Sequence, residues 1–299
     1  MTRLARFAWF VLGYNVVVIL LGAVVRATGS GAGCGPSWPT CQGEVVPELE
    51  GATAVEFTHR AASGIALVLV FSLALMVWRR TRSGNPARRG AMLSVLAIIG
   101  EALIGALIVL AEWVAEDASV ARVVSVPLHL VNTFFLLTAL TLTAYWLAGG
   151  GRLDFKTRRN VVRLVYVGGV ALILIAATGA ITALADTLFP KSAGADLSGT
   201  SHFLTDLRIL HPVLAIVAAG AGWWAAMRTG LARSPSAIAL PTLVGLMLIT
   251  GLANIALGVP VWMQVVHLAV ADALWIAFVL TAAGALQASE RDSRLSPSR

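Results

Sequence analysis

Four histidines are the residues of this chain best suited to chemistry. His59, His129, His211 and His267 each lie near one end of a different hydrophobic segment, the second, fourth, sixth and eighth of eight. An ionisable side chain inside a membrane is costly unless a partner holds it, so such residues are candidates for function. Two pairs of histidines at matched depth suit the axial positions of two hemes. The alternative for each histidine is a hydrogen bond to a neighbouring helix.

A bare metal ion matches this pattern less well than a porphyrin. Zinc and di-iron sites in helical bundles recruit thiolates or carboxylates, often through a Glu-x-x-His spacing on each of two helices. Here that spacing occurs once, from Glu56 to His59. Small residues of the odd-numbered segments would leave room for a flat macrocycle, although small residues also pack helices. These are Gly100, Gly105, Ala106, Gly179, Ala180, Gly245 and Gly251.

The composition predicts an all-α integral membrane protein. Hydrophobic residues make up 58% of the chain, charged residues make up 12%, and the mean hydropathy is +0.83. A helix that crosses a bilayer needs about 20 largely apolar residues. Arg3 and Arg6 precede the first apolar run, which is too long for a cleaved signal. We predict eight transmembrane helices, at 4–25, 56–78, 90–111, 123–147, 161–184, 207–227, 237–258 and 262–286.

The charged residues predict the orientation of these helices. Arginines and lysines crowd the connection after the second segment and the link after the fourth, and they include Arg79, Arg80, Arg82, Arg88, Arg89, Arg152, Lys156, Arg158, Arg159 and Arg163. By the positive-inside rule these connections are cytoplasmic, so both termini are cytoplasmic as well. The pI of 10.4 therefore reflects topology, and we expect no nucleic acid partner because the basic residues are divided among short connections.

The sequence pattern indicates two pseudo-symmetric four-helix bundles. Residues 1–150 form the first, with a long outer loop at 26–55, and residues 151–299 form the second, followed by a short polar cytoplasmic tail. Each copy has an even number of spans, so the copies share one orientation. All four histidines then lie toward the outer face. A fifth, His202, lies in a polar loop and is expected to be exposed.

Other polar residues have two interpretations each. Cys34 and Cys41 in the outer loop favour a disulfide, either a structural clasp or a redox pair. Glu56, one turn before His59, either handles a proton or water, or favours the start of its helix through the macrodipole. Glu101 and Asp272 lie deep in their segments and must face the bundle interior.

Several sequence motifs together resemble the heme A synthase family. These are TGSGAGCGPSWPTCQG after the first segment, EFTHR in the second, PLHLVN in the fourth, LHPVLA in the sixth and HLAVAD in the eighth. The resemblance covers nearly the whole membrane domain. It implies an oxidoreductase in a bacterial cell membrane that oxidises a ring methyl of heme O to a formyl group, through an alcohol, giving heme A for cytochrome oxidase. Implied partners are heme O synthase, cytochrome oxidase assembly factors and a membrane electron acceptor, and a homo-oligomer is an open alternative.

The resemblance also implies roles for individual residues. His211 and His267 match the axial ligands of a resident heme b in the second half, and His59 and His129 match the pair in the substrate half. Glu56 matches a carboxylate implicated in catalysis. Cys34 and Cys41 match a cysteine pair of the first outer loop, whereas the second outer loop, 185–206, has no cysteine.

Two arginines, Arg26 and Arg60, lie near the outer ends of their segments and are candidates for contacts with heme propionates. The alternative is that their long side chains only extend to the membrane interface. Two other functions fit the same histidines. One is a di-heme cytochrome b that transfers electrons from quinol, and the other is a heme transporter or chaperone.

Overall fold

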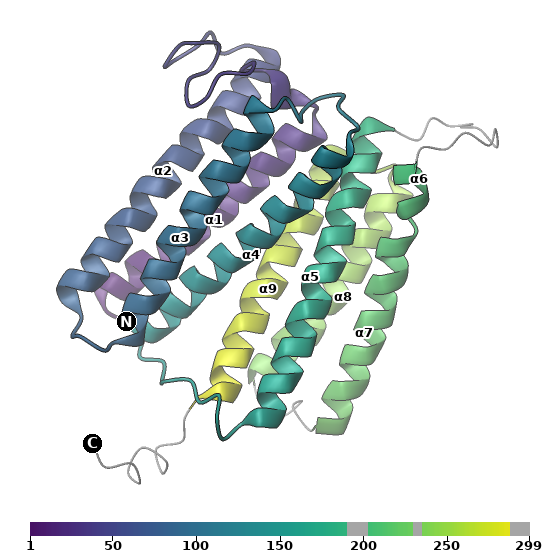
Figure 1. The fold of residues 1–299 in the computed structure, drawn as a ribbon. Helices are drawn as coiled ribbons and strands as arrows, with labels where there is room; N and C mark the ends of the chain where they lie inside the picture. Colours follow the sequence, from purple (N-terminus) through teal and green to yellow (C-terminus); the bar gives the residue numbers. More distant parts are fainter. Residues whose placement is uncertain (190–202, 230–234, 288–299) are drawn as a thin grey trace.

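A computed structural model describes residues 1–189, 203–229 and 235–287 of the chain, and the elements it contains in those ranges are helices (Figure 1). They are α1 (Arg3–Ala27), a 3-10 helix (Ser30–Ala32), α2 (Gly51–Arg80), α3 (Pro86–Leu110), α4 (Val120–Leu147), α5 (Arg159–Leu188), α6 (Phe203–Leu207), α7 (Leu210–Thr229), α8 (Pro235–Ala256) and α9 (Val261–Leu286). Within the described residues seven helices are long and apolar enough to cross a membrane. The predicted all-α membrane fold is confirmed.

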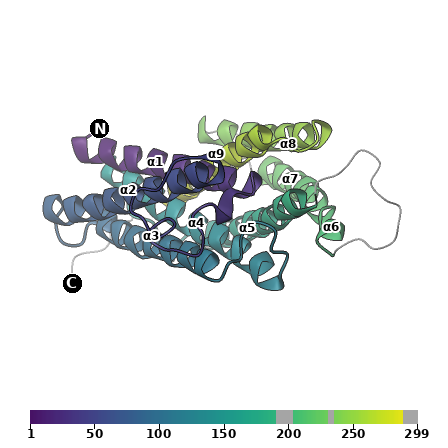
Figure 2. The same ribbon diagram turned by 90° about the horizontal axis from the view of Figure 1, so that it is seen from above.

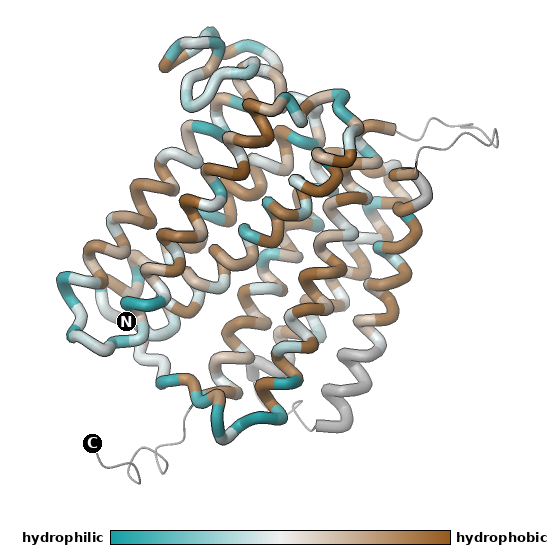
Figure 3. Tube along the Cα trace, in the orientation of Figure 1, coloured by the Kyte–Doolittle hydropathy of each residue, from teal (hydrophilic) through white to brown (hydrophobic). Residues whose placement is uncertain are grey.

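The helices are arranged in two neighbouring groups. Helices α1 to α4 form one group and α5, α7, α8 and α9 form the other, with α9 between them (Figures 1 and 2). Helix α1 begins and α9 ends at one end of the array, and the connection 28–50 lies at the opposite end. Hydrophobic residues predominate along the helices, and polar residues gather near several of their ends (Figure 3). The cytoplasmic side and the symmetry between the halves remain predictions.

Capping side chains mark where several helices begin. Thr2 accepts a hydrogen bond from the N–H of Ala5 at the start of α1, and Ser119 accepts one from the N–H of Arg122 at the start of α4. Asn85 caps α3, and Pro86 follows at the first helical position, where its missing N–H costs nothing. These caps satisfy backbone donors that the helix itself leaves free.

Several helix starts differ from the sequence prediction by a few residues, and α3 begins at Pro86, four residues before the predicted 90. Helix α2 begins at Gly51, five residues before the predicted 56, because hydropathy marks the apolar part of a helix and not its first polar turns. The predicted helix at 207–227 corresponds to α7, which begins at Leu210 after the short α6 (Phe203–Leu207). Pro212 then lies in the first turn of α7, where a proline breaks no intrahelical hydrogen bond.

The two groups are joined by an aromatic pair and by an arginine. The rings of Phe134 in α4 and Trp275 in α9 stack with centroids 4.6 Å apart, and Trp275 Nε1 donates to the Phe134 carbonyl over 2.9 Å. Arg26, near the end of α1, donates to the Ala183 carbonyl of α5 over 2.7 Å and to Gln264 Oε1 of α9 over 2.9 Å. Helix α9 therefore packs against helices of the first half as well as against those of the second half.

Candidate functional site: two histidine pairs

The histidines of the second half form a pair. His211, in the first turn of α7, and His267 of α9 have ring centroids 6.3 Å apart, and their planes are nearly perpendicular at 89°. Both side chains are partly buried. The sequence prediction that these two residues meet is therefore consistent with the geometry.

The hydrogen bonds of this pair determine which ring nitrogen carries the proton. His211 Nδ1 lies 3.0 Å from the Ile175 carbonyl, which can only accept. His267 Nδ1 lies 3.0 Å from Thr250 Oγ1, whose own proton is donated to the Leu246 carbonyl over 2.8 Å. Each Nδ1 must therefore be the donor, so Nε2 of both imidazoles keeps its lone pair, the form that binds a metal.

The histidines of the first half have a different environment. His59 of α2 and His129 of α4 are partly buried. No hydrogen-bond partner among the described residues reaches the Nδ1 atom of either one. Glu101 Oε2 lies 3.2 Å from His129 Nδ1, within ion-pair distance but without the alignment of a hydrogen bond.

Glu101 is held by side chains of α4. Asn132 Nδ2 donates to its Oε1 over 2.6 Å and Thr133 Oγ1 donates to its Oε2 over 3.1 Å. Asn132 also donates to the Ala97 carbonyl over 2.9 Å and fills the space beside Gly100, where an added Cβ would lie 2.9 Å from Asn132 Oδ1. The expectation that Glu101 faces the bundle interior is consistent with these contacts, which place its carboxylate behind the ring of His129.

Each of the four histidines lies close to a glycine of another helix. That helix comes directly before the helix of the histidine in the chain, except that the short α6 lies between α5 and α7. An added Cβ would come within 3.0 Å of the His59 ring at Gly22, within 2.8 Å of the His211 ring at Gly179, and within 3.3 Å of the His267 ring at Gly251. At Gly105 the nearest atom is His129 Nε2, at 3.9 Å. Glycine therefore lets each imidazole approach the backbone of its neighbour, most tightly at Gly179.

The predicted disulfide is confirmed, since Cys34 and Cys41 are bonded with an S–S distance of 2.01 Å. Both cysteines are buried beneath their loop. Gly33 lies directly on the start of α2, where an added Cβ would be 2.4 Å from the Ala52 carbonyl carbon. Thr53 Oγ1 donates to the Gly33 carbonyl over 2.8 Å. The loop is thus attached to the first turns of α2.

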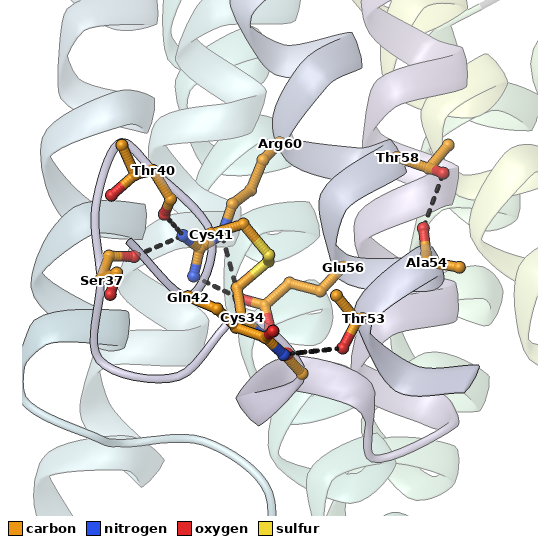
Figure 4. The surroundings of a disulfide bond; sticks show 11 residues. Cys34, Ser37, Thr40, Cys41, Gln42, Thr53, Ala54, Glu56, Thr58 and Arg60 are labelled. Carbon is orange, nitrogen blue, oxygen red and sulfur yellow. Dashed lines mark hydrogen bonds and ion pairs between the residues drawn. A yellow bond between two sulfur atoms is a disulfide. The ribbon is translucent and has the colours of Figure 1, made fainter. Parts of the chain in front are cut away.

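Glu56 and Arg60 complete this attachment (Figure 4). Glu56 is 3% exposed, and its Oε1 lies 2.6 Å from Arg60 Nη2. Arg60 Nη1 also donates to the carbonyls of Ser37 and Thr40, over 2.5 and 2.8 Å. Because α2 begins at Gly51, Glu56 lies beyond its first turn, so the macrodipole gives a weak account of this buried carboxylate.

Asp272 of α9 is a second buried carboxylate, and it is fully enclosed. Neither of its carboxylate oxygens has a hydrogen-bond partner among the described residues. Arg26 and Arg60 have the protein partners given above, and their contacts with propionates remain predictions. His202 lies outside the described residues.

Two threonines of the second half were missed by sequence reasoning. Thr178 and Thr250 approach the histidine rings, and they immediately precede Gly179 and Gly251. The repeated Thr-Gly step was the signal that could have revealed them.

Comparison with known proteins gives one family match and several relatives. The COX15-CtaA family of cytochrome oxidase assembly proteins matches residues 5–279. A protoheme IX farnesyltransferase of Thermus thermophilus is 45% identical over 297 residues, covering 96% of this chain and 49% of that protein. Heme A synthases of Bacillus mycoides and Bacillus cereus are 36% and 35% identical over 142 residues, 47% of this chain and 45% of theirs. The chain thus spans about half the length of these relatives.

Proposed function

This chain belongs to the family of cytochrome oxidase assembly proteins, and we propose that it is a heme A synthase. The reaction is the oxidation of a ring methyl of heme O to a formyl group through an alcohol. Each hydroxylation inserts one oxygen atom and removes two electrons, and the product of the second, a geminal diol, loses water to give the formyl group. The enzyme therefore needs an oxygen source and an electron acceptor outside the chain. The sequence resemblance predicted this family, and that prediction is confirmed.

The observation that carries the proposal is the distance between His211 and His267. A metal–imidazole bond is about 2 Å long and the ring centre lies about 1 Å further, so two imidazoles on opposite sides of one iron have centres about 6 Å apart. The measured separation is 6.3 Å. The tautomer deduced above also leaves Nε2 of both rings free for iron. His211 and His267 would therefore be the residues that hold a resident heme b.

The proposed roles of the two halves, electron transfer in the second and substrate binding in the first, follow from this ligand set. When bound, a heme held by two protein histidines would supply electron transfer and not oxygen binding. His211 and His267 would hold it in the second half. Heme O would bind as substrate between His59 and His129, where Glu56 is the carboxylate nearest in sequence. Glu56 would move a proton or orient water during methyl oxidation.

One comparison favours a second candidate, a protoheme IX farnesyltransferase. The Thermus relative that carries this name is 45% identical to the chain. The chain covers 49% of that protein, so the name describes a molecule about twice as long. The heme A synthase assignment is better supported because it uses all four histidines, whereas prenyl transfer changes no oxidation state and calls for no axial pair.

Production of hemes in a bacterial host separates these candidates. In a host that makes heme O but no heme A, expression of the chain should yield heme A and its alcohol precursor, measured by chromatography and mass spectrometry. In a host that makes only heme b, it should yield neither heme O nor heme A. Appearance of heme O in the second host would support the farnesyltransferase. Two identical hemes in the purified protein, without new heme products, would support the electron carrier.

A further inference from the structure

The atoms behind the histidines differ between the two halves of the chain. In the second half, Thr250 Oγ1 lies 3.0 Å from His267 Nδ1. Thr178 Oγ1 lies 3.4 Å from His211 Nδ1 and donates over 2.8 Å to the same Ile175 carbonyl that His211 contacts. Both threonines immediately precede the glycine on which the imidazole packs.

The first half lacks this arrangement. The residue before Gly22, which packs on His59, is Leu21, and the residue before Gly105 is Ile104. The Nδ1 atoms of His59 and His129 have no hydrogen-bond partner among the described residues. A hydrogen bond at Nδ1 fixes the ring orientation and tautomer of a metal-binding histidine, and its loss typically costs about 10- to 100-fold in metal affinity.

We propose that Thr250, assisted by Thr178, is a positioning residue that makes the second histidine pair a permanent heme site. In the first half Leu21 offers no hydroxyl to His59, and the Glu101 carboxylate lies 3.2 Å from His129 Nδ1. His59 is therefore the histidine left free to reorient, so that this half can accept heme O and release heme A. This inference rests on the proposed function, because it presumes a resident heme in one half and an exchanging heme in the other.

Thr250→Val tests the first part of the proposal, since valine keeps the shape of threonine and removes the hydroxyl. Purified protein with its bound heme is mixed with an excess of a heme-scavenging apoprotein, and the loss of low-spin heme b is followed by absorbance. We expect about 10-fold faster loss than from the unchanged protein, together with an altered electron paramagnetic resonance signal. Thr250→Ser should restore slow loss, because serine keeps the hydroxyl.

Thr281→Val is the matched control. Thr281 lies on α9, the helix of His267, and like Thr250 it donates to a carbonyl of its own helix, that of Ala277, over 2.8 Å. In the part of the chain that the structure describes, no hydrogen bond joins it to a histidine, so the variant should release heme b at the unchanged rate. Equal rates and unchanged spectra for Thr250→Val and Thr281→Val would overturn the proposal. A protein that never contains low-spin heme b would instead overturn the proposed function.

Leu21→Thr tests the second part, by placing a hydroxyl before Gly22 and beside His59. Heme held in the first half should then be lost more slowly, by several-fold, and heme A should accumulate on the protein. Leu21→Val, which shortens the side chain without adding a hydroxyl, is the control. Equal release from both variants would overturn the assignment of exchange to the missing hydroxyl.

Discussion

The backbone N–H of Cys34 donates a hydrogen bond to Oε2 of Glu56 over 2.8 Å. The disulfide loop and the carboxylate expected to act in catalysis are therefore one unit, with the Oε1 atom of Glu56 paired to Arg60. Two roles for Glu56 follow. It either handles protons near the substrate, or it serves only to hold the loop on α2.

Glu56→Gln distinguishes these two roles. The amide keeps an oxygen that accepts from Arg60 or Cys34, but it has no basic site for a proton. We expect heme O or the alcohol to accumulate, with the resident heme retained, as measured by chromatography of cellular hemes. Thr53→Val is the control, because it removes the bond from Thr53 to the Gly33 carbonyl and leaves the carboxylate in place. It should make the loop more sensitive to protease while heme A formation continues. Normal heme A in the Glu56→Gln strain would end the catalytic role.

His211→Ala should abolish binding of the resident heme b, because it removes one of its two axial bonds. The pyridine hemochrome assay on purified protein measures this loss. His202→Ala, a change of the one histidine predicted not to bind heme, should retain full heme content. Full retention of low-spin heme b in His211→Ala would show that the second half does not bind heme through this residue.

Gly179→Ala should weaken the same site without touching a ligand. The added Cβ would lie 2.8 Å from His211 Cε1, so the ring would have to move. Overpacking of this kind costs about 1–3 kcal/mol, and we expect a several-fold lower heme b content after purification. Gly220→Ala is the control, since a Cβ there meets no atom within 4 Å. Equal heme content in the two variants would contradict the packing of His211 on this glycine.

Glu101→Gln should weaken heme binding in the first half. A carboxylate behind a ligand histidine raises the basicity of the imidazole, and loss of such a partner typically costs about 10–100-fold in affinity. Titration of purified protein with heme O measures the change. Glu112→Gln alters an exposed acid in the connection after α3 and should bind heme O normally. Unchanged affinity for heme O in Glu101→Gln would show that the contact between Glu101 and His129 does not contribute to heme binding.

The disulfide should be present in the mature protein. Thiol labelling of membranes without reductant is expected to leave Cys34 and Cys41 unlabelled, and labelling after reduction should modify both. Replacing both by serine should lower the stability of the loop by about 2 kcal/mol, seen as faster proteolysis of the loop. Labelling of both thiols in untreated membranes would contradict the bond.

Long apolar runs explain why the helices could be predicted from sequence, since each must satisfy its backbone within the bilayer. The pairing of His211 with His267 was predicted from their places on the second and fourth helices of one expected four-helix bundle. Contacts that depend on helix rotation could not be predicted in this way. Hydropathy carries no information about which side of α8 faces α9, so Thr250 was missed. The polar start of α2 was missed for a related reason, and with it the distance of Glu56 from the helix end.

The clasp made by Arg26 has a consequence for biogenesis. Gln264 follows Arg26 by 238 positions, and the Ala183 carbonyl follows it by 157. During synthesis α1 enters the membrane long before these acceptors exist, so the guanidinium must wait at the water interface, where a long arginine side chain can reach. Closure of the clasp is therefore complete only after insertion of α9, and a chain truncated before α9 would leave Arg26 without the Gln264 acceptor.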